Sequence, residues 1–426
     1  MSVAILFGVF ILLLALGVPV GFALLAGALA TLWSLDLSPL VLVQQTVAGA
    51  SAPSLIAIPL FVLAGELMLR GGISDRLIAL AASLVGHLRG GLGQVSVVSS
   101  LFFGGVSGSA IADVSAVGGS MIPQMVKRGF HTDFAVNVCI TAALVALLVP
   151  PSHNLILYSA AAGGRVSIID LFAAGVVPAL MMTVALMVTG WVIARRRGYA
   201  VEAFPGFGIV LRRLVAALPG LLLVALIFVG IKAGIFTAVE SAAVAVAYAV
   251  ALTALLYRTL RWRLFVETLF AAVRTTGAVV FVIAAASCFG WLLAYLQVPA
   301  ATVAALTEIT REPLLVLALM VLVLLALGTF MDLAPMIIIC TPIFLPLARA
   351  VGVDPVHFGV VLILAGGIGL ITPPVGSVLF VGAAIGRIDV AVALRSIWPF
   401  YGAAAFVLGL VSFLPQLSLW LPRMLR

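Results

Sequence analysis

Apolar runs long enough to cross a lipid bilayer recur along the whole chain, rather than at one anchor. A helix needs about 20 apolar residues to span the hydrocarbon core. Two stretches, 94–126 and 314–347, are apolar but interrupted in the middle. The other runs occupy residues 4–33, 54–68, 134–149, 171–194, 214–236, 238–257, 276–296, 358–371 and 401–420. The sequence therefore predicts an all-α polytopic membrane protein with about eleven membrane segments and two re-entrant pieces.

The composition excludes the other broad classes. The chain has 426 residues, of which 22 are Lys or Arg and 14 are Asp or Glu. These charged residues make up 8% of the chain, against about a quarter in soluble proteins. The three cysteines occur singly in apolar runs, so their spacing predicts neither a transition-metal site nor a redox motif. An ordinary soluble enzyme, a disordered protein and a disulfide scaffold are all excluded.

The net charge of +8 comes from short basic clusters at the ends of apolar runs. The clusters at 195–213 and 258–263 are separated by two predicted helices, so both lie on one side, which is cytoplasmic by the positive-inside rule. The charge therefore predicts membrane orientation and not nucleic-acid binding. The N-terminus has no positively charged leader segment, so we expect a retained first helix. Residues 74–89 are amphipathic at helical spacing and predict an interfacial helix.

An internal repeat organises the chain. VSGSAIAD (106–113) and VPPSHNLILYS (149–159) in the first half are followed by LGTFMD (327–332) and TPPVGSVLFVG (372–382) in the second. The offset is 220 positions from Gly108 to Gly328 and 223 from Pro150 to Pro373. Pro123 and Pro346 are also 223 positions apart. We infer that the chain contains two copies of one unit, and that Asp113 and Asp332 occupy matching places.

Each copy of the repeat contains a double proline, Pro150-Pro151 in the first and Pro373-Pro374 in the second. A proline inside a helix removes a backbone donor and clashes with the preceding turn, so each pair predicts a broken membrane helix. Bared backbone groups persist at membrane depth only when they are buried in protein or line a polar cavity. Corresponding broken helices in two repeats are typical of secondary transporters, with a site at the repeat interface.

Hydroxyls and carbonyls without clustered carboxylates suit a small monovalent cation such as Na⁺. The hydroxyls of Ser107, Ser109 and Thr329 are candidates, with small-residue helix packing as the alternative. Half-helix N-termini suit a carboxylate substrate. Asp113 and Asp332 serve either ion coupling or helix capping. His153 is either a substrate ligand or a histidine satisfied at the helix break.

An enzyme is a competing interpretation. Gly105 to Gly108 spell G-x-S-G, which resembles the nucleophile motif of rhomboid intramembrane serine proteases, with His153 as a conceivable base. This motif is short, and the second copy has no comparable serine. The sequence contains no nucleotide-binding motif, so we expect transport driven by an ion gradient and no enzymatic activity.

Three segments resemble one family closely. They are residues 65–130, GIFTAVESAAVAVAY (234–248) and GGIGLITPPVGSVLFVGAAIG (366–386). The chain resembles the large membrane subunit of tripartite ATP-independent periplasmic (TRAP) transporters along essentially its whole length. The resemblance implies Na⁺-driven uptake of an organic anion, such as a C4-dicarboxylate or a sugar acid, across a bacterial or archaeal inner membrane. It also implies a periplasmic substrate-binding protein and a small four-helix membrane subunit as partners, and no organic cofactor.

The family fold implies an elevator with inverted repeats, two re-entrant hairpins and two broken helices. Scaffold helices would occupy 1–90, 166–312 and 389–426, and the transport domain 91–165 and 313–388. Na⁺ is the only metal ion implied. Its two sites would use Ser107, Ser109, Leu148 and Pro150, and Gly328, Thr329, Gly366 and Pro373. The substrate contacts would be Asp113, Ser152, His153, Asn154, Asp332 and Ser377.

Two departures from the family pattern stand beside the first double proline. Residues 142–148 (AALVALL) have no hydroxyls, which leaves backbone carbonyls as the Na⁺ ligands of that helix. His153 and Asn154 replace a usual Ile-Pro pair, which suggests a substrate contact particular to a subgroup. Other open alternatives are a stand-alone elevator-type anion symporter, an ion antiporter and an anion channel.

Overall fold

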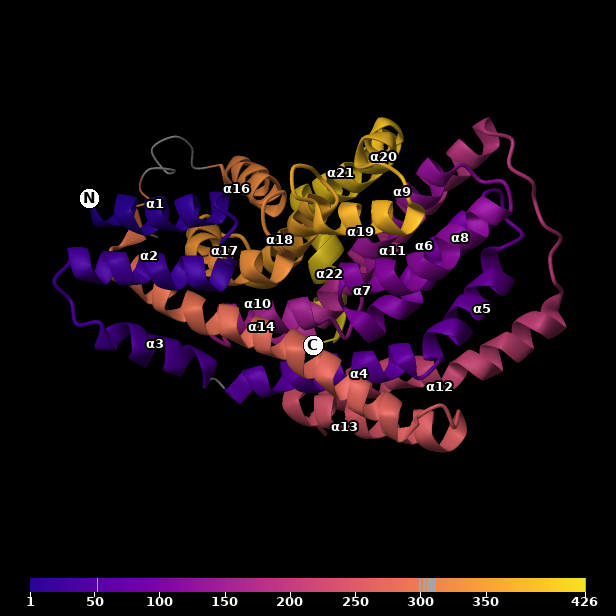
Figure 1. Ribbon diagram of the computed structural model, residues 1–426, viewed down its shortest axis with the longest axis horizontal. Coiled ribbons are helices and arrows are strands. Elements are labelled where there is room, and N and C mark those ends of the chain that lie inside the picture. Colours follow the sequence, from indigo (N-terminus) through magenta and orange to yellow (C-terminus); the bar gives the residue numbers. More distant parts are fainter. Residues whose placement is uncertain (52, 299, 302–303, 305–311, 426) are drawn as a thin grey trace.

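The computed structural model describes residues 1–425 except 52, 299, 302–303 and 305–311, and the regular elements in this part of the chain are helices (Figure 1). The first half contains α1 (Ser2–Ala15), α2 (Val20–Ser34), α3 (Leu40–Ala50), η1 (Pro53–Ile56), α4 (Ala57–Arg70), α5 (Ile73–Val85), α6 (Gly91–Ser107), α7 (Ala110–Asp113), η2 (Val114–Gly118), α8 (Gly119–Lys127), α9 (Thr132–Ala146), α10 (His153–Ala161) and α11 (Ile168–Arg196). The second half contains α12 (Phe207–Lys232), α13 (Ala238–Ala251), η3 (Leu252–Leu256), α14 (Trp262–Tyr295), α16 (Pro313–Gly328), α17 (Leu333–Ala350), α18 (Pro355–Leu370), α19 (Ser377–Gly386), α20 (Val390–Ser396), α21 (Trp398–Phe413) and α22 (Gln416–Leu425).

Several apolar runs are divided into more than one helix. The run 4–33 forms α1 and α2, because Gly17 has a positive φ of 80° and Pro19 precedes the second helix. The run 401–420 is bent by 58° between α21 and α22. Among the described residues, five helices are long and apolar enough to cross a bilayer, or up to eight if each bent pair is one span. This is fewer than the sequence predicts, since several other apolar helices have only 10–17 residues.

One group of helices surrounds α14, the longest helix described. Figure 1 shows α1, α2 and α3 at the end of the molecule that holds the N-terminus, with α14 running diagonally beside them. α14 packs against α2, α3 and α4, and α4 packs against α13. The Phe10 ring packs at a tilt against Phe289 of α14, with ring centroids 5.5 Å apart. We name α1–α4 and α12–α14 the outer group.

The helices α6–α10 and α16–α19 form two copies of one unit with matching bounds. α7 and α17 begin 223 positions apart, at Ala110 and Leu333, and so do α9 and α18, at Thr132 and Pro355. In copy 1, α6 packs against α8 and α9; in copy 2, α16 packs against α17 and α18. We call α6–α8 hairpin 1 and α16–α17 hairpin 2. The predicted repeat is thus present in the order and length of the helices.

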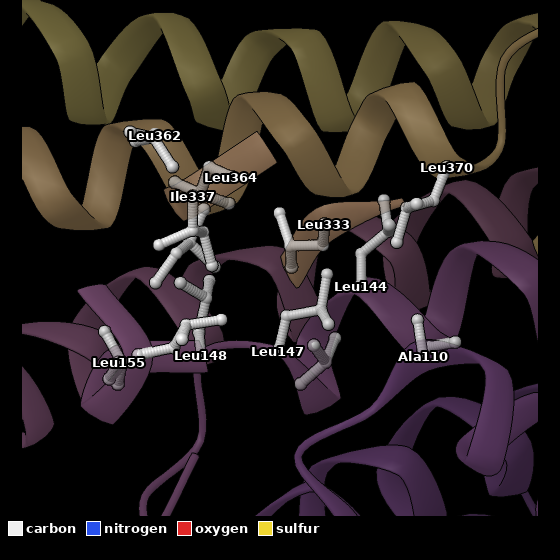
Figure 2. Packing of buried hydrophobic residues seen from close by; sticks show 14 of the residues in the cluster. Ala110, Leu144, Leu147, Leu148, Leu155, Leu333, Ile337, Leu362, Leu364 and Leu370 are labelled. Carbon is white, nitrogen blue, oxygen red and sulfur yellow. The ribbon is translucent and has the colours of Figure 1, made fainter. Parts of the chain in front are cut away.

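The two copies meet through apolar side chains. Figure 2 shows Leu144, Leu147 and Leu148 of copy 1 facing Leu333 and Ile337 of copy 2. Glycines let the backbones approach. A Cβ on Gly367 would lie 2.7 Å from Leu147, and one on Gly359 would lie 2.4 Å from the Tyr158 ring. The Tyr158 hydroxyl donates to the Pro355 carbonyl at 2.7 Å. In lipid such packing, rather than the hydrophobic effect, drives helix association.

The predicted interfacial helix is α5, and it joins α4 at a bend of 65°. The bend lies at Gly71 and Gly72, and Gly72 has a positive φ of 81°. The Thr259 hydroxyl donates to the Gly71 carbonyl at 2.8 Å. The Arg76 guanidinium lies 3.6 Å from the centroid of the Tyr257 ring. The loop between α13 and α14 therefore anchors the start of α5.

Two ion pairs tie copy 1 to the predicted cytoplasmic side. Arg197, next to the end of α11, donates two hydrogen bonds of 2.7 and 2.9 Å to Asp133 in the first turn of α9. Arg128, after α8, pairs with Glu202 in the loop between α11 and α12. The Asp133 hydrogen bonds raise the pKa of Arg197 further above its ordinary value. The open end of hairpin 1 and the start of α9 thus lie beside the basic cluster at 195–213.

Candidate functional site

Copy 1 is interrupted at residues 147–152, which we call break 1. α9 ends at Ala146 and α10 begins at His153, with a cis peptide bond between Pro150 and Pro151. The Ser152 hydroxyl donates to the Leu147 carbonyl at 2.7 Å, so it does not cap α10. Break 1 is largely buried, and Ser152 is fully buried. The predicted interruption of the first helix is present.

Copy 2 is interrupted at residues 371–376, which we call break 2. α18 ends at Leu370 and α19 begins at Ser377. The Tyr401 hydroxyl, from α21, donates to the Ile371 carbonyl at 2.5 Å, and the Thr372 hydroxyl donates to the Ile368 carbonyl at 2.7 Å. Unlike break 1, break 2 is exposed at Pro373, Pro374 and Val375.

The tip of hairpin 1, at Gly108 and Ser109, lies against break 1. Gly108 has a φ of 58°, which favours glycine. The Asn154 side-chain amide donates to the Gly108 carbonyl at 2.7 Å. A Cβ on Gly108 would lie 2.9 Å from His153 Nδ1 and 3.1 Å from the His153 amide nitrogen, so a side chain here would displace His153. The structure therefore brings Gly108, His153 and Asn154 together.

The tip of hairpin 2, at residues 329–332, lies against break 2. The Val375 amide donates to the Thr329 carbonyl at 3.1 Å. A Cβ on Gly369 would lie 2.4 Å from the backbone of Gly328, so α16 and α18 touch backbone to backbone. The Thr329 hydroxyl donates to the Ala326 carbonyl at 2.7 Å. Each hairpin tip thus meets the break of its own copy.

The two candidate acids do not occupy matching places, so that part of our prediction is wrong. Asp332 is the N-cap of α17 and accepts a hydrogen bond from the Leu333 amide at 2.9 Å. The residue 223 positions before it is Ser109, the N-cap of α7, which accepts from the Ala112 amide at 3.4 Å. Asp113 lies one turn further along. The capping alternative for Asp332 is therefore observed.

Asp113 lies inside hairpin 1 and away from its tip. It is fully buried and accepts a 2.6 Å hydrogen bond from Ser100 on α6. Its Oδ1 has no hydrogen-bond partner among the described residues. The five residues after it form the π-helical turn η2. The predicted contact of Asp113 with the substrate stays a prediction.

The remaining candidates are distributed around the two breaks. The Leu148 carbonyl faces Gly175 of α11, where a Cβ would lie 2.3 Å from it. Gly366 packs against Leu333 and Met336, and its carbonyl lies near Gly328. The Ser377 hydroxyl is buried without a partner among the described residues. Ser107 ends α6, and its side chain lies outside the described ones.

A small cavity of about 20 Å³ separates break 1 from the outer group. Pro151 and His153 line one side, together with Gly105 of hairpin 1. Side chains of α4, α12 and α13 form the opposite wall, among them Phe61, Met68, Leu223 and Ile227. This volume holds about one water molecule. His153 is therefore the polar side chain that faces an otherwise apolar wall.

Two contacts of the site were missed in the sequence. The hydrogen bond from Tyr401 closes the end of α18, and the one from Ser100 satisfies Asp113. A tyrosine in an apolar run signals a hydroxyl that needs a partner, although it does not say which one. No group of three or more His, Cys, Asp or Glu within the described residues is arranged to hold a metal ion.

The family model described as "Tripartite ATP-independent periplasmic transporter, DctM component" matches residues 7–417. The chain is 38% identical to the sialic acid TRAP transporter large permease protein SiaM of Vibrio cholerae, over 97% of this chain and 96% of that protein. It is 35% identical to the C4-dicarboxylate TRAP transporter large permease protein DctM of the same species, over 100% of this chain and 98% of that protein.

Two further similarities extend the comparison. The uncharacterized protein YgiK of Salmonella typhimurium is 38% identical over 99% of this chain and 97% of its own length. Among solved structures, the YdaH transporter of Alcanivorax borkumensis aligns with a TM-score of 0.63 at 14% identity, covering 89% of this chain and 87% of that one. At this identity the likeness concerns the fold alone.

Proposed function

The chain belongs to the DctM component family of tripartite ATP-independent periplasmic transporters, and from this premise we propose that it couples the import of an organic anion to Na⁺. It is a large permease subunit of the bacterial inner membrane, and a transporter rather than an enzyme. The serine-protease interpretation of Ser107 and His153 is therefore wrong. Ion coupling and the mechanism are the proposed part.

The observation that carries the proposal is the contact of each hairpin tip with the break of its own copy. The link is Asn154 to Gly108 in copy 1 and Val375 to Thr329 in copy 2. In the proposed sites, carbonyls freed by each broken helix act together with a tip hydroxyl, from Ser109 or Thr329. Oxygen ligands of this kind suit Na⁺. We assign one Na⁺ to each contact, with the ligands predicted from the sequence.

The number of membrane crossings between the two hairpins supports opposite orientations of the two copies in the membrane. α11, α12, α13 together with η3, and α14 are each long and apolar enough to span a bilayer. Together with the broken helix of copy 1 they make five crossings in the described residues between the starts of hairpins 1 and 2. An odd number of crossings puts the two starts on opposite sides. Inverted repeats of this kind are typical of secondary transporters.

The two packing groups support an elevator. We assign the hairpins and broken helices, at 91–165 and 313–388, to a moving transport domain, and most of the outer group to the scaffold. Na⁺ bound at a tip compensates the charge of a substrate carboxylate as the domain crosses the membrane. Because the two ligands favour the same closed tip, each raises the affinity for the other by the same factor.

The proposed partners follow from the family. A periplasmic substrate-binding protein delivers the anion, and a small four-helix membrane subunit braces the scaffold. The relatives named for sialic acid and for C4-dicarboxylates indicate carboxylates as the substrate class. The half-helix N-terminus of α10, next to His153, is the proposed carboxylate contact.

Uptake by the reconstituted three-component system tests the proposal. We expect import into proteoliposomes with an inward Na⁺ gradient and none in K⁺-only buffer. Ser109→Leu and Thr329→Leu should each abolish uptake, while Val392→Leu, at an exposed position of α20, should leave it unchanged. Equal uptake in Na⁺-free buffer would exclude Na⁺ as the coupling ion. Uptake by this chain without the binding protein would instead favour a stand-alone symporter.

A further inference from the structure

The double proline of break 2 interrupts the hydrogen bonding of α18 at defined backbone groups. In an uninterrupted helix each amide donates to the carbonyl four residues earlier. The two prolines have no amide hydrogen, so they cannot serve the carbonyls of Gly369 and Leu370. The first amide after the pair is that of Val375, and its acceptor in a continuous helix would be the Ile371 carbonyl. These two groups are therefore the first donor and acceptor that could continue the helix past the prolines.

In the structure both groups have other partners. The Ile371 carbonyl accepts a hydrogen bond of 2.5 Å from the Tyr401 hydroxyl, which α21 contributes. The Val375 amide donates at 3.1 Å to the Thr329 carbonyl, at the tip of hairpin 2. The tyrosine hydroxyl thus satisfies the carbonyl that the Val375 amide would serve in a continuous helix. The amide is thereby left to hold the hairpin tip.

Copy 1 has no tyrosine at the equivalent place and holds its tip differently. α11 packs against α9 as α21 packs against α18, and at the offset of 223 positions Tyr401 corresponds to Pro178 of α11. The Leu148 carbonyl, which corresponds to that of Ile371, packs closely against the backbone of α11. The tip of copy 1 is held by the Asn154 side chain. The tyrosine therefore occurs in the copy whose tip is held by an amide of the break.

We propose that Tyr401 is a positioning residue that keeps the tip of hairpin 2 in place for ion binding. It acts through the Ile371 carbonyl and the Val375 amide and does not touch the ion. This inference rests on the proposed function, because it takes the contact between hairpin 2 and break 2 as a Na⁺ site. Without the hydroxyl, the Ile371 carbonyl lacks a donor at membrane depth, which is costly. The Val375 amide then turns toward this carbonyl and leaves Thr329, so the tip opens.

The Na⁺ dependence of uptake by the reconstituted three-component system tests the inference. Tyr401→Phe removes only the hydroxyl, and we expect the Na⁺ concentration for half-maximal uptake to rise about threefold or more, as the loss of one hydrogen bond allows. The uptake rate at saturating Na⁺ should change little. Tyr248→Phe is the matched control, because its hydroxyl donates at 2.8 Å to the Pro219 carbonyl within the outer group. An unchanged Na⁺ dependence in Tyr401→Phe overturns this inference alone, whereas Na⁺-independent uptake by the unmodified chain overturns the proposed function.

A variant that keeps a donor separates positioning from packing. 4-Aminophenylalanine at position 401 has an N–H group in place of the hydroxyl and can donate to the Ile371 carbonyl. We expect it to restore the Na⁺ dependence of the unmodified chain. If this variant needs as much Na⁺ as Tyr401→Phe, the hydrogen bond does not position the tip and the inference is wrong.

Chemical labelling of the tip gives a readout that does not depend on transport. Phe330 is 63% exposed at the tip of hairpin 2, and the three cysteines of the chain are buried, so Phe330→Cys places a reactive thiol there. In lipid nanodiscs we expect Na⁺ to slow maleimide labelling of this variant, and to slow it much less when Tyr401→Phe is added. Equal slowing in both overturns the inference. No slowing in either overturns the assignment of Na⁺ to this tip, which belongs to the proposed function.

Discussion

Break 1 and break 2 occupy equivalent positions, yet one is buried and the other is open. In copy 1 an amide side chain, Asn154, holds the hairpin tip, and the helices α4, α12 and α13 cover the break. In copy 2 a backbone amide, that of Val375, holds the tip, and three residues of the break are exposed. The repeated backbone fixes where the carbonyls are bared, while side chains decide what holds each tip.

This difference indicates separate roles for the two copies. A backbone contact tolerates substitution at the same position, whereas a side-chain contact depends on one residue. The hairpin tip of copy 1 is therefore held by one specific side chain, and the hairpin tip of copy 2 is held by close backbone packing.

The backbone contact of copy 2 predicts the largest loss. Gly369→Ala places a Cβ within 2.4 Å of the Gly328 backbone, which cannot rotate away as a side chain would. We expect a loss of about 1–3 kcal/mol in unfolding free energy and uptake reduced by at least tenfold. Thermal unfolding and proteoliposome uptake measure the two effects. Gly119→Ala is the control, since no atom lies within 4 Å of its added Cβ; equal behaviour of the two variants would contradict the contact.

The side-chain contact of copy 1 predicts the next effect. Asn154→Ala leaves the buried Gly108 carbonyl without its donor, which costs about 1–3 kcal/mol. The equivalent change in copy 2, Ser377→Ala, removes a hydroxyl with no partner among the described residues and should leave the unfolding free energy nearly unchanged. Thermal unfolding without substrate distinguishes them. Equal losses in both variants would mean that the copies hold their tips in the same way.

The two N-caps predict a smaller difference. Ser109→Ala removes a cap and should cost about 0.5–2 kcal/mol. Asp332→Asn keeps a capping oxygen for the Leu333 amide, so it should change stability less. Because it removes a charge beside the proposed Na⁺ site, it should still raise the Na⁺ concentration for half-maximal uptake. A stability loss in Asp332→Asn as large as in Ser109→Ala would show that the charge itself stabilises the fold.

The smallest effect is expected where copy 2 is made to resemble copy 1. Thr372 corresponds to Val149, and its hydroxyl donates to a carbonyl within its own helix. Thr372→Val should therefore change the unfolding free energy by less than about 0.5 kcal/mol. Thermal unfolding checks this, and Na⁺-driven uptake should stay near the unmodified level. A strong loss of uptake with intact stability would place the Thr372 hydroxyl in the ion site.

The sequence was informative wherever local chemistry decides the backbone. The double prolines predicted both breaks, and the amphipathic spacing predicted α5. The alignment of the two copies was harder to predict from the sequence, because glycines are frequent. Gly108, which the sequence analysis matched with Gly328, is not its equivalent. The offset of 223 positions pairs Gly105 with Gly328 and Ser109 with Asp332. Asp113 and Asp332 are 219 positions apart, so neither the offset of 220 nor that of 223 pairs them.

Contacts between distant segments could not be predicted. The hydrogen bonds of Tyr401 to Ile371 and of Asn154 to Gly108 join residues 30 and 46 positions apart. The apolar runs of the sequence also did not predict α3, because Gln44 and Gln45 interrupt the apolar run there. In a membrane protein nearly every helix is apolar on most faces, so periodicity does not say which face meets which partner.

The anchored start of α5 has a mechanical consequence. Thr259 and Tyr257 fasten the helix at Gly71 and Arg76, while the rest of α5 packs along α6 of hairpin 1. Because α5 is held at its start by these contacts, it resists rotation there and bends along its length instead. In the proposed elevator movement, hairpin 1 would therefore either slide along α5 or bend it, and a bent α5 would pull the hairpin back toward its starting position.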